Sequence, residues 1–500
     1  MSAATRLVHF RVNDARTGQP TPIRIRLTDS AGNYLAPLGR LTEFATGPNQ
    51  DVGGNLQIGS EKHAYIDGSC EISLPPGPIS VEVAKGPEYL PISRQGALGA
   101  GQLALRLEVE RWTDMRADGW YAGDCRVHFL SPHGALLEGA AEDLAVVNLL
   151  VTDCEIPSGS GERLPAISNL LGFSGRSPAL ERPGHIVVVN THNRHPQLGS
   201  LALLNCHRVV YPLSFGGPNG NEDWTLADWC DQCHRKGGMV VWTREDADDR
   251  SWGEALADLV LGKIDAFEIS ARDGPDLFGL DQWYTLLGAG LRVPIVGSSV
   301  KVSNRTALGC VRTYARLKDG EGFSYKAWID AVRAGRTFVT SGPLLRLSLD
   351  GVDPGAALSV AGGQPIQVRA HAASKTDFEG VEIIFNGSPI LDAVATGTPA
   401  SAVVDEAFIP PISGWLAARC LSSRSQALQN KPCLCAHTSP IYIGVDDRAC
   451  QPNTGCVAAL QTHLEDAARW VGEHALCESE AGRARLLGLF EEARKRLGPN

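Results

Sequence analysis

The sequence predicts a multidomain α/β plus β protein, in which a distorted α/β barrel stands between two β-sandwich-like domains and a helical tail ends the chain. Three patterns predict this fold class. Apolar and polar residues alternate over 1–111, apolar runs alternate with helical stretches over 112–340, and a β pattern returns over 341–446 before a helical segment, 447–500. A chain of 500 residues is too long for one hydrophobic core, so several domains are expected.

The first domain is predicted as a small β-sandwich. The segments "PIRIRL" (22–27), "ISVEV" (79–83) and "LALRLEV" (103–109) alternate apolar and polar residues, which indicates half-buried strands. Turn-forming stretches such as "DSAGNY" and "LPPGP" separate the strands. Two packed sheets are the simplest way to bury one face of each strand.

The middle of the chain alternates strands with helices. Apolar runs such as "LAVVNLLVTD", "HIVVVN", "GGMVVWT" and "VPIVGSS" are separated in part by helix candidates at 225–237, 253–263 and 281–290. Near-continuous apolar strands with helical connections favour a parallel sheet. Seven such strands over roughly 200 residues predict an incomplete or distorted α/β barrel, with an open doubly wound sheet as the alternative.

The last part of the chain returns to strands and then turns helical. "PIQVRAHA", "GVEIIFNG" and "SPIYIGVD" predict strands of a second sandwich that ends near residue 446. Helical spacing then places five apolar residues on one face of the tail: Val457, Leu460, Leu464, Ala467 and Val471.

Composition narrows the class of protein. The net charge is −10 and no basic patch stands out, so nucleic acid is not expected as a partner. No run of about 18 apolar residues predicts a membrane span, and the first residues, "MSAATRLVHFRV", lack the apolar core of a secretory signal. The 13 cysteines are interpreted as reduced, mostly core thiols, which predicts a cytoplasmic location.

Polar residues gather where the middle strands end. Parallel α/β barrels carry their chemistry at the carboxyl ends of the strands, so these positions are the candidate site. Histidines and carboxylates concentrated there are typical of a metal hydrolase, although ordinary polar surface loops would give a similar pattern. The strand-end residues are Asp124, Arg126, His128, Asp153, Glu155, Asn190, His192, His195, Arg244, Glu245, Asp246, Glu268, Ser298, Ser299, Lys301 and Asn304.

The middle segment, roughly 112–345, resembles the PHP superfamily of metal-dependent hydrolases and within it the CehA/McbA branch. The matching stretches include "GWYAGDCRVHF", "EDLAVVNLLVTD", "GEALADLVLGKIDAFEIS" and "YKAWIDAVRAGRTFVTSGPLL". The resemblance implies a distorted (β/α)7 barrel with a di- or trinuclear zinc, manganese or iron site. Such a site would activate water for attack on an ester, carbamate or phosphoester.

Three ligand positions of that family carry different residues here. The opening motif, Gly-Asp-x-His-x-His, has Arg126 in place of its first His. Arg244 stands where the family often has the His of a Pro-His pair, and Val300 stands where it often has the Asp of Gly-Ser-Asp. Neither a guanidinium nor a valine side chain offers a lone pair to a metal.

These substitutions replace neutral or anionic ligands with two permanent cations and one apolar side chain. We therefore expect the arginines to fill the space of the metal ions beside Asp124, Asp153 and Glu155. They would either pair with these acids or hold an anionic ligand in bidentate fashion. A residual single-metal site is the alternative, with ligands from Asp124, His128, His192 and His195.

Two functions follow from this interpretation, and the sequence leaves it undecided whether the chain is an enzyme. The first is a pseudoenzyme, a non-catalytic binding or assembly module with an Arg-lined pocket, without a cofactor, and with an anionic small molecule or a second copy of the chain as partner. The second is an active hydrolase with an altered, mononuclear zinc, manganese or iron centre. The predicted pocket comprises Asp124, Arg126, His128, Asp153, Glu155, His192, His195, Arg244, Val300 and Lys301.

A separate motif, "CDQCH" (230–234), matches the C-x-x-C-H pattern of covalent haem attachment and resembles half of a zinc site. No second C-x-x-C is placed to complete a zinc cage. Because the motif falls in a helix candidate beside Leu226 and Trp229, its cysteines are interpreted as core residues.

Overall fold

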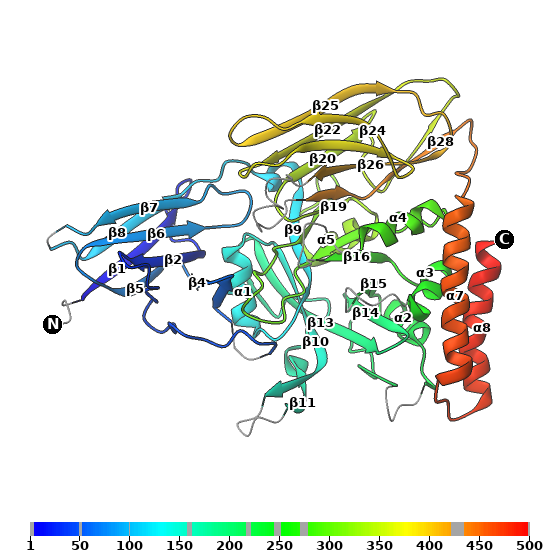
Figure 1. The fold of residues 1–500 in the computed structure, drawn as a ribbon, viewed down its shortest axis with the longest axis horizontal. Helices are drawn as coiled ribbons and strands as arrows, with labels where there is room; N and C mark the ends of the chain where they lie inside the picture. Colours follow the sequence, from blue (N-terminus) through cyan, green and yellow to red (C-terminus); the bar gives the residue numbers. More distant parts are fainter. Residues whose placement is uncertain are drawn as a thin grey trace.

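The computed structural model describes residues 5–49, 53–99, 101–157, 163–216, 222–244, 252–270, 279–421 and 435–498, without the side chains of 155–157, 163–164 and 421. The described chain is mostly β, with 40% of residues in strands and seven α-helices. Figure 1 shows a strand-rich N-terminal part, a central curled sheet, a C-terminal β part and a pair of long helices that ends the chain.

The central part is built from one curled sheet. Its strands are β9 (Trp120–Val127), β10 (Val146–Pro157), β13 (His185–His195), β14 (Gly199–Leu204), β15 (Met239–Thr243), β16 (Ala266–Ser270), β17 (Ile295–Ser298), β18 (Arg312–Arg316) and β19 (Thr337–Thr340). Two further short strands border it: β11 (Arg163–Ser168) and β12 (Leu180–Arg182). Its helices are α1 (Pro132–Ala141), α2 (Leu226–Arg235), α3 (Gly253–Val260), α4 (Leu280–Gly288) and α5 (Tyr325–Arg333).

The predicted (β/α)7 barrel is wrong. The pairings run β19–β18–β9–β10–β13–β14–β15–β16–β17, and half of them are antiparallel: β19–β18, β18–β9, β13–β14 and β14–β15. The reason lies in the connections. Only residues 196–198 join β13 to β14, and a parallel pair needs a crossover of a dozen residues or more. The result is a mixed, curled sheet in a mostly β chain.

The N-terminal strands form two sheets around one apolar core. One sheet has the order β5-β1-β8 and the other β3-β4-β2-β6-β7. Val8, Phe10, Ile25 and Leu27 lie in the core between them. The strands are β1 (Arg6–Asp14), β2 (Ile23–Asp29), β3 (Asn55–Ile58), β4 (Glu61–Ile66), β5 (Ser69–Leu74), β6 (Pro78–Ala84), β7 (Ile92–Ala97) and β8 (Ala104–Val109).

The C-terminal strands continue from the central sheet. β27 pairs with β19, and β26, β28, β23, β24 and β21 follow from it, while β20, β22 and β25 form a separate sheet. The two groups share an apolar core with Leu347, Val368, Ile383 and Leu416. The strands are β20 (Leu344–Leu349), β21 (Ala357–Val360), β22 (Ile366–Ser374), β23 (Gly380–Phe385), β24 (Ser388–Val394), β25 (Ala400–Phe408), β26 (Gly414–Leu421), β27 (Ala436–Thr438) and β28 (Ile441–Val445).

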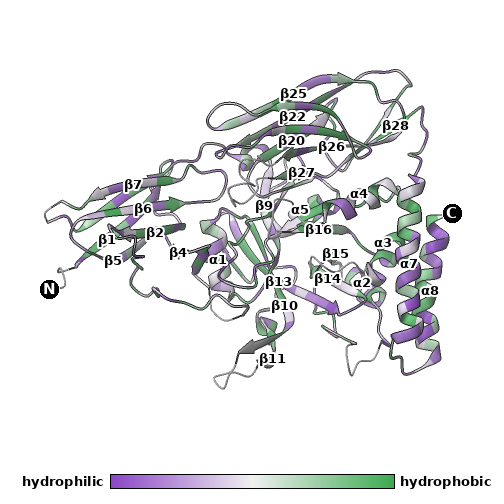
Figure 2. Cartoon of the chain, viewed as in Figure 1, coloured by the Kyte–Doolittle hydropathy of each residue, from purple (hydrophilic) through white to green (hydrophobic). Residues whose placement is uncertain are grey.

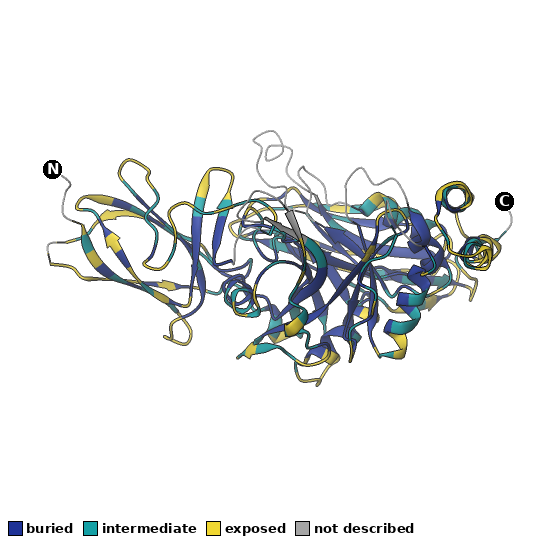
Figure 3. Ribbon diagram, turned by 90° about the horizontal axis from the view of Figure 1, so that it is seen from below, coloured by how far each residue is buried: buried dark blue, intermediate teal, exposed yellow. Residues whose placement is uncertain are grey.

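The chain ends in two antiparallel helices, α7 (Thr454–His474) and α8 (Glu480–Leu497). Their apolar faces, with Leu460, Leu464 and Phe490, join the core that includes α2, α3 and α4. In Figure 3 these helices are seen end-on at one side of the molecule, with exposed residues on their outer faces. No helix of the described residues combines the length and apolar character that a membrane crossing requires.

The interior of the central sheet is where charged residues become buried. Figure 2 shows hydrophobic residues along its strands, as expected for a sheet covered on both faces. Nevertheless Asp124, Arg126, Arg244 and Glu268 are all 4% exposed or less. Burial of charge costs free energy unless it is paired and hydrogen-bonded, so the contacts of these residues decide what the site can do.

Candidate functional site

The centre of the site is an ion pair between β9 and β16. Arg126 Nε donates to Glu268 Oε1 at 3.0 Å, and Arg126 Nη2 donates to Glu268 Oε2 at 2.7 Å. The two side chains are 2% and 1% exposed. The guanidinium thus binds the carboxylate in bidentate fashion, the strongest geometry available to this pair.

Neighbouring groups complete the pair. Ser298 Oγ, at the end of β17, donates to Glu268 Oε1. The backbone N–H of Arg244 lies 3.4 Å from Glu268 Oε2, and its carbonyl accepts from Arg126 Nη2 at 2.8 Å. Both carboxylate oxygens of Glu268 therefore have at least two donors each, and little acceptor capacity remains for another cation.

Asp124 is satisfied separately, two residues before Arg126 on the same strand. Its Oδ1 accepts from the backbone N–H groups of Arg126 at 3.2 Å and Ser299 at 3.1 Å. Its Oδ2 accepts from Ser299 Oγ at 2.5 Å and from Gly309 N–H at 2.9 Å. Burial raises the pKa of Asp124 to about 6, against the lowering effect of these four hydrogen bonds.

Two histidines, His128 and His192, lie beside this centre. His128 and His192 have ring centroids 5.3 Å apart, and His192 Nε2 shares a 3.0 Å hydrogen bond with Thr243 Oγ1. Burial, and then the nearby Arg126 and Arg194, hold the pKa of His192 well below its usual range. The predicted grouping of Asp124, Arg126, His128, His192 and Arg244 is thus an extended buried polar cluster.

His195 lies apart from His192. The two are three residues apart on β13, so they point to opposite faces of the strand. His195 Nδ1 accepts from the backbone N–H groups of Gln197 at 3.1 Å and Leu198 at 2.9 Å, and its Nε2 lies 3.4 Å from Glu222 Oε1. Its ring packs between Phe215 and Trp470, and burial lowers its pKa to about 4.

Lys301 also belongs to another contact. Its fully buried ammonium lies 3.3 Å from Glu138 Oε2 on α1 and donates to the carbonyls of Ser303 and Thr306. Val300, between Ser299 and Lys301, is half-buried and has a φ of 50°. A β-branched residue seldom adopts this conformation, so the bend after β17 is strained at this position.

The remaining predicted acids add no ligand to the centre. Asp153 is half-buried and its Oδ2 accepts from Ser214 Oγ at 2.8 Å. The side chain of Glu155 and the residues Glu245 and Asp246 lie outside the described part of the chain.

The two predicted asparagines also bind elsewhere. Asn304 Nδ2 donates to the carbonyl of Ala45, and Asn190 Oδ1 accepts from the N–H of Asn205.

This donor set does not fit the metal ions that the family resemblance implies. In the described residues, no three His, Cys, Asp or Glu side chains at this centre bring their ligand atoms within 4.8 Å of one another. Glu268 is bound by Arg126, and the oxygens of Asp124 are bound by hydroxyl and N–H donors. A divalent cation placed here would also face the positive charge of Arg126.

Glu268 is predicted to lie at a strand end but is not included in the predicted pocket. It is a strand-end acid in "IDAFEIS", but nothing in the sequence connects it with Arg126, which is 142 residues away. Its only sequence signal is a carboxylate inside an otherwise apolar strand, where an unpaired charge would be costly.

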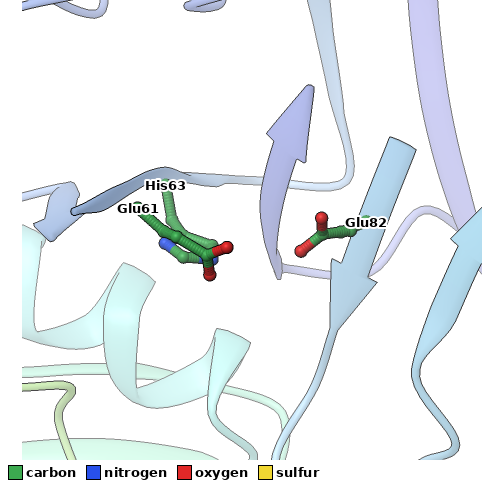
Figure 4. A group of neighbouring side chains, drawn as sticks. All are labelled: Glu61, His63 and Glu82. Carbon is green, nitrogen blue, oxygen red and sulfur yellow. The ribbon is translucent and has the colours of Figure 1, made fainter. Parts of the chain in front are cut away.

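A second polar group lies on the N-terminal sheet, away from the centre. Glu61, His63 and Glu82 bring one ligand atom each within 4.8 Å of one another (Figure 4). Arg26 lies on the strand between them, donates to Glu82 Oε1 at 2.7 Å and has its Nη2 3.7 Å from Glu61 Oε1. Because the guanidinium of Arg26 already pairs with both carboxylates, we do not assign a metal to this group.

Comparison with known proteins adds no identification. The chain matches no family model, and no curated protein matches it. The likeness to PHP hydrolases therefore stays a prediction from the sequence motifs.

Removing one partner of the central ion pair should destabilise the fold strongly. Arg126→Met leaves the Glu268 carboxylate buried without its cation, so the free energy of unfolding should fall by about 3–5 kcal/mol in urea denaturation. The double variant Arg126→Met/Glu268→Met should recover a large part of that loss, because both desolvation costs disappear together.

The exposed pair of Arg369 and Asp405, 3.2 Å apart, is the matched control. Arg369→Met should cost less than about 1 kcal/mol, as exposed ion pairs do. The single variant Glu268→Met completes the comparison. If the losses in the free energy of unfolding of the two single variants simply add in the double variant, the two side chains do not depend on each other.

Asp124 should make stability depend on pH. Its pKa rises from 3.8 to about 6 on folding, so between these values the folded state holds a proton that the unfolded state has lost. Stability should therefore fall as pH rises through this window, by about 2–3 kcal/mol relative to Asp124→Asn, and then level off. Urea denaturation of both proteins from pH 4 to pH 8 measures this, and a difference that stays constant or grows with pH would contradict it.

Proposed function

We propose that this chain is a non-catalytic binding or assembly module, a pseudoenzyme derived from a metal-dependent hydrolase whose metal site has become an ion pair. The observation that carries the proposal is the buried, bidentate contact of Arg126 with Glu268. The ancestry rests on the sequence resemblance, and the (β/α)7 architecture forms no part of it.

The contacts of the centre support loss of metal chemistry. A catalytic metal site needs several deprotonated ligands that converge and an open coordination position for water. Here the carboxylate of Glu268 accepts hydrogen bonds from Arg126 and Ser298. The carboxylate of Asp124 accepts from Ser299 and from backbone N–H groups. His192 Nε2 shares a hydrogen bond with Thr243. The centre is neutralised from within and stabilises the sheet.

These contacts also favour a structural over an anion-binding role for Arg126. Its Nε and Nη2 donate to Glu268 and to a carbonyl, so an incoming anion would compete with a buried carboxylate. The predicted anionic small molecule would reach arginine side chains more readily in a pocket of about 270 Å³ beside α4. In this pocket Arg292 stacks on Tyr442 at 4.5 Å, and Arg448 also lines the wall.

Metal binding by the purified chain tests the proposal. After removal of metal with a chelator, equilibrium dialysis against Zn²⁺ or Mn²⁺ should show no binding that depends on Asp124. The triple variant Arg126→His/Arg244→His/Val300→Asp restores the family's ligand types and should gain about one equivalent of metal, because Glu268 is released at the same time.

Both measurements are made in a His63→Ala background, which removes any contribution from the Glu61, His63 and Glu82 group. Stoichiometric metal in the unmodified centre that disappears on Asp124→Asn would refute the proposal. A folded triple variant that binds no metal would show that these three positions were never ligands.

A further inference from the structure

Two thiols meet between β14 and α2. The Sγ atoms of Cys206, just after β14, and Cys233, in the last turn of α2, are 3.3 Å apart. The residues are 1% and 0% exposed. A disulfide has an S–S distance of about 2.05 Å, so a shift of roughly 1.3 Å would bring the sulfurs to bonding distance.

Hydrogen bonds from the residues on either side of Cys206 hold the two sulfurs close together. Asn205 Nδ2 donates to the carbonyl of Gly237 at 3.0 Å, and the N–H of His207 donates to the carbonyl of Lys236 at 3.3 Å. The N–H of Asn205 is bound in turn by Asn190 Oδ1 at 2.8 Å. The segment that carries Cys206 is thus fastened directly to the loop that follows α2.

Gly238 provides the space for the two sulfurs. A Cβ at this position would lie 2.4 Å from Cys206 Sγ and 2.6 Å from Cys233 Sγ. Both distances are far shorter than any carbon–sulfur contact, so a side chain here would push the thiols apart. The pair therefore depends on a glycine at the entry to β15.

The other cysteine of the C-D-Q-C-H motif faces a different neighbour. Cys230 Sγ lies 3.9 Å from Asp258 Oδ2 on α3, and His234 Nε2 is 2.9 Å from Asp265 Oδ2. The two cysteines of the motif therefore do not act together, and the partner of Cys233 comes from outside the motif.

We propose that Cys206 and Cys233 form a redox modification site, at which hydrogen peroxide converts the two thiols into a disulfide that ties β14 to α2. One sulfur, as thiolate, attacks the peroxide oxygen and becomes a sulfenic acid with release of water. The second sulfur attacks the sulfenic sulfur and releases a second water. Two thiols thus lose two protons and two electrons, and one hydrogen peroxide becomes two waters.

The surroundings set the rate and the effect of this step. Burial raises the pKa of Cys233, which slows attack, and the ammonium of Lys236 lies within electrostatic reach of both sulfurs. A small oxidant suits a buried pair that is reached only by local opening. The bond would close a loop between positions 27 apart and so restrict the unfolded chain.

Oxidation of the full-length chain tests the proposal. The reduced protein is treated with hydrogen peroxide, remaining thiols are alkylated, and peptides are mapped by mass spectrometry. We expect a Cys206–Cys233 cross-linked peptide, 2 Da lighter than the two thiol peptides together, and a rise in Tm of a few degrees that dithiothreitol reverses.

Variants separate the pair from its neighbours. Cys206→Ser and Cys233→Ser should abolish the cross-link and the Tm rise, whereas Cys230→Ser, one turn away on α2, should keep both. The proposal is overturned if peroxide oxidises other cysteines of the folded wild type while Cys206 and Cys233 stay alkylated. It is overturned equally if either joins a different cysteine. The wild-type peptide map distinguishes these outcomes even if a serine variant fails to fold.

Discussion

The bidentate pair of Arg126 and Glu268 is the constraint on which the interior of this protein depends. It joins β9 to β16 across the curled sheet, with both side chains almost wholly buried. Neither charge would be stable there alone, because the desolvation free energy of each ion is offset only by its partner and by the hydrogen bonds around the pair. Ser298 and the backbone of Arg244 supply those hydrogen bonds, so β17 and the end of β15 are held to the same point.

Other polar residues of the interior are satisfied in separate groups. Asp124 takes its donors from Ser299 and Gly309, and Lys301 is bound to Glu138. His195 lies near the C-terminal helices, beside Trp470. A metal centre would need several of these side chains to turn toward one ion, whereas each is held by a different neighbour. The arrangement is that of a buried polar core in which each charged group has its own partners.

The sequence predicts local features but not their assembly. Alternating apolar and polar residues predict the strand of residues 23–29. Helical spacing of apolar residues predicts the buried face that includes Leu460 and Leu464. The barrel is wrong because "GSLALL" (199–204) turns back on β13 after three residues, which apolar runs alone do not reveal. Arg126 stands out in the sequence as an altered ligand, but its partner lies 142 residues away, and sequence spacing carries no information about that contact. The predicted site groups His192 with His195, although strand geometry separates them.

The most direct test of the central claim is a crystal structure of the wild-type chain grown with Mn²⁺, with data collected for anomalous scattering. We predict the Arg126 guanidinium on Glu268 and no anomalous peak within coordination distance of Asp124 or Glu268. A strong peak bound by either carboxylate, with Arg126 displaced from Glu268, would contradict this claim and restore the metal centre.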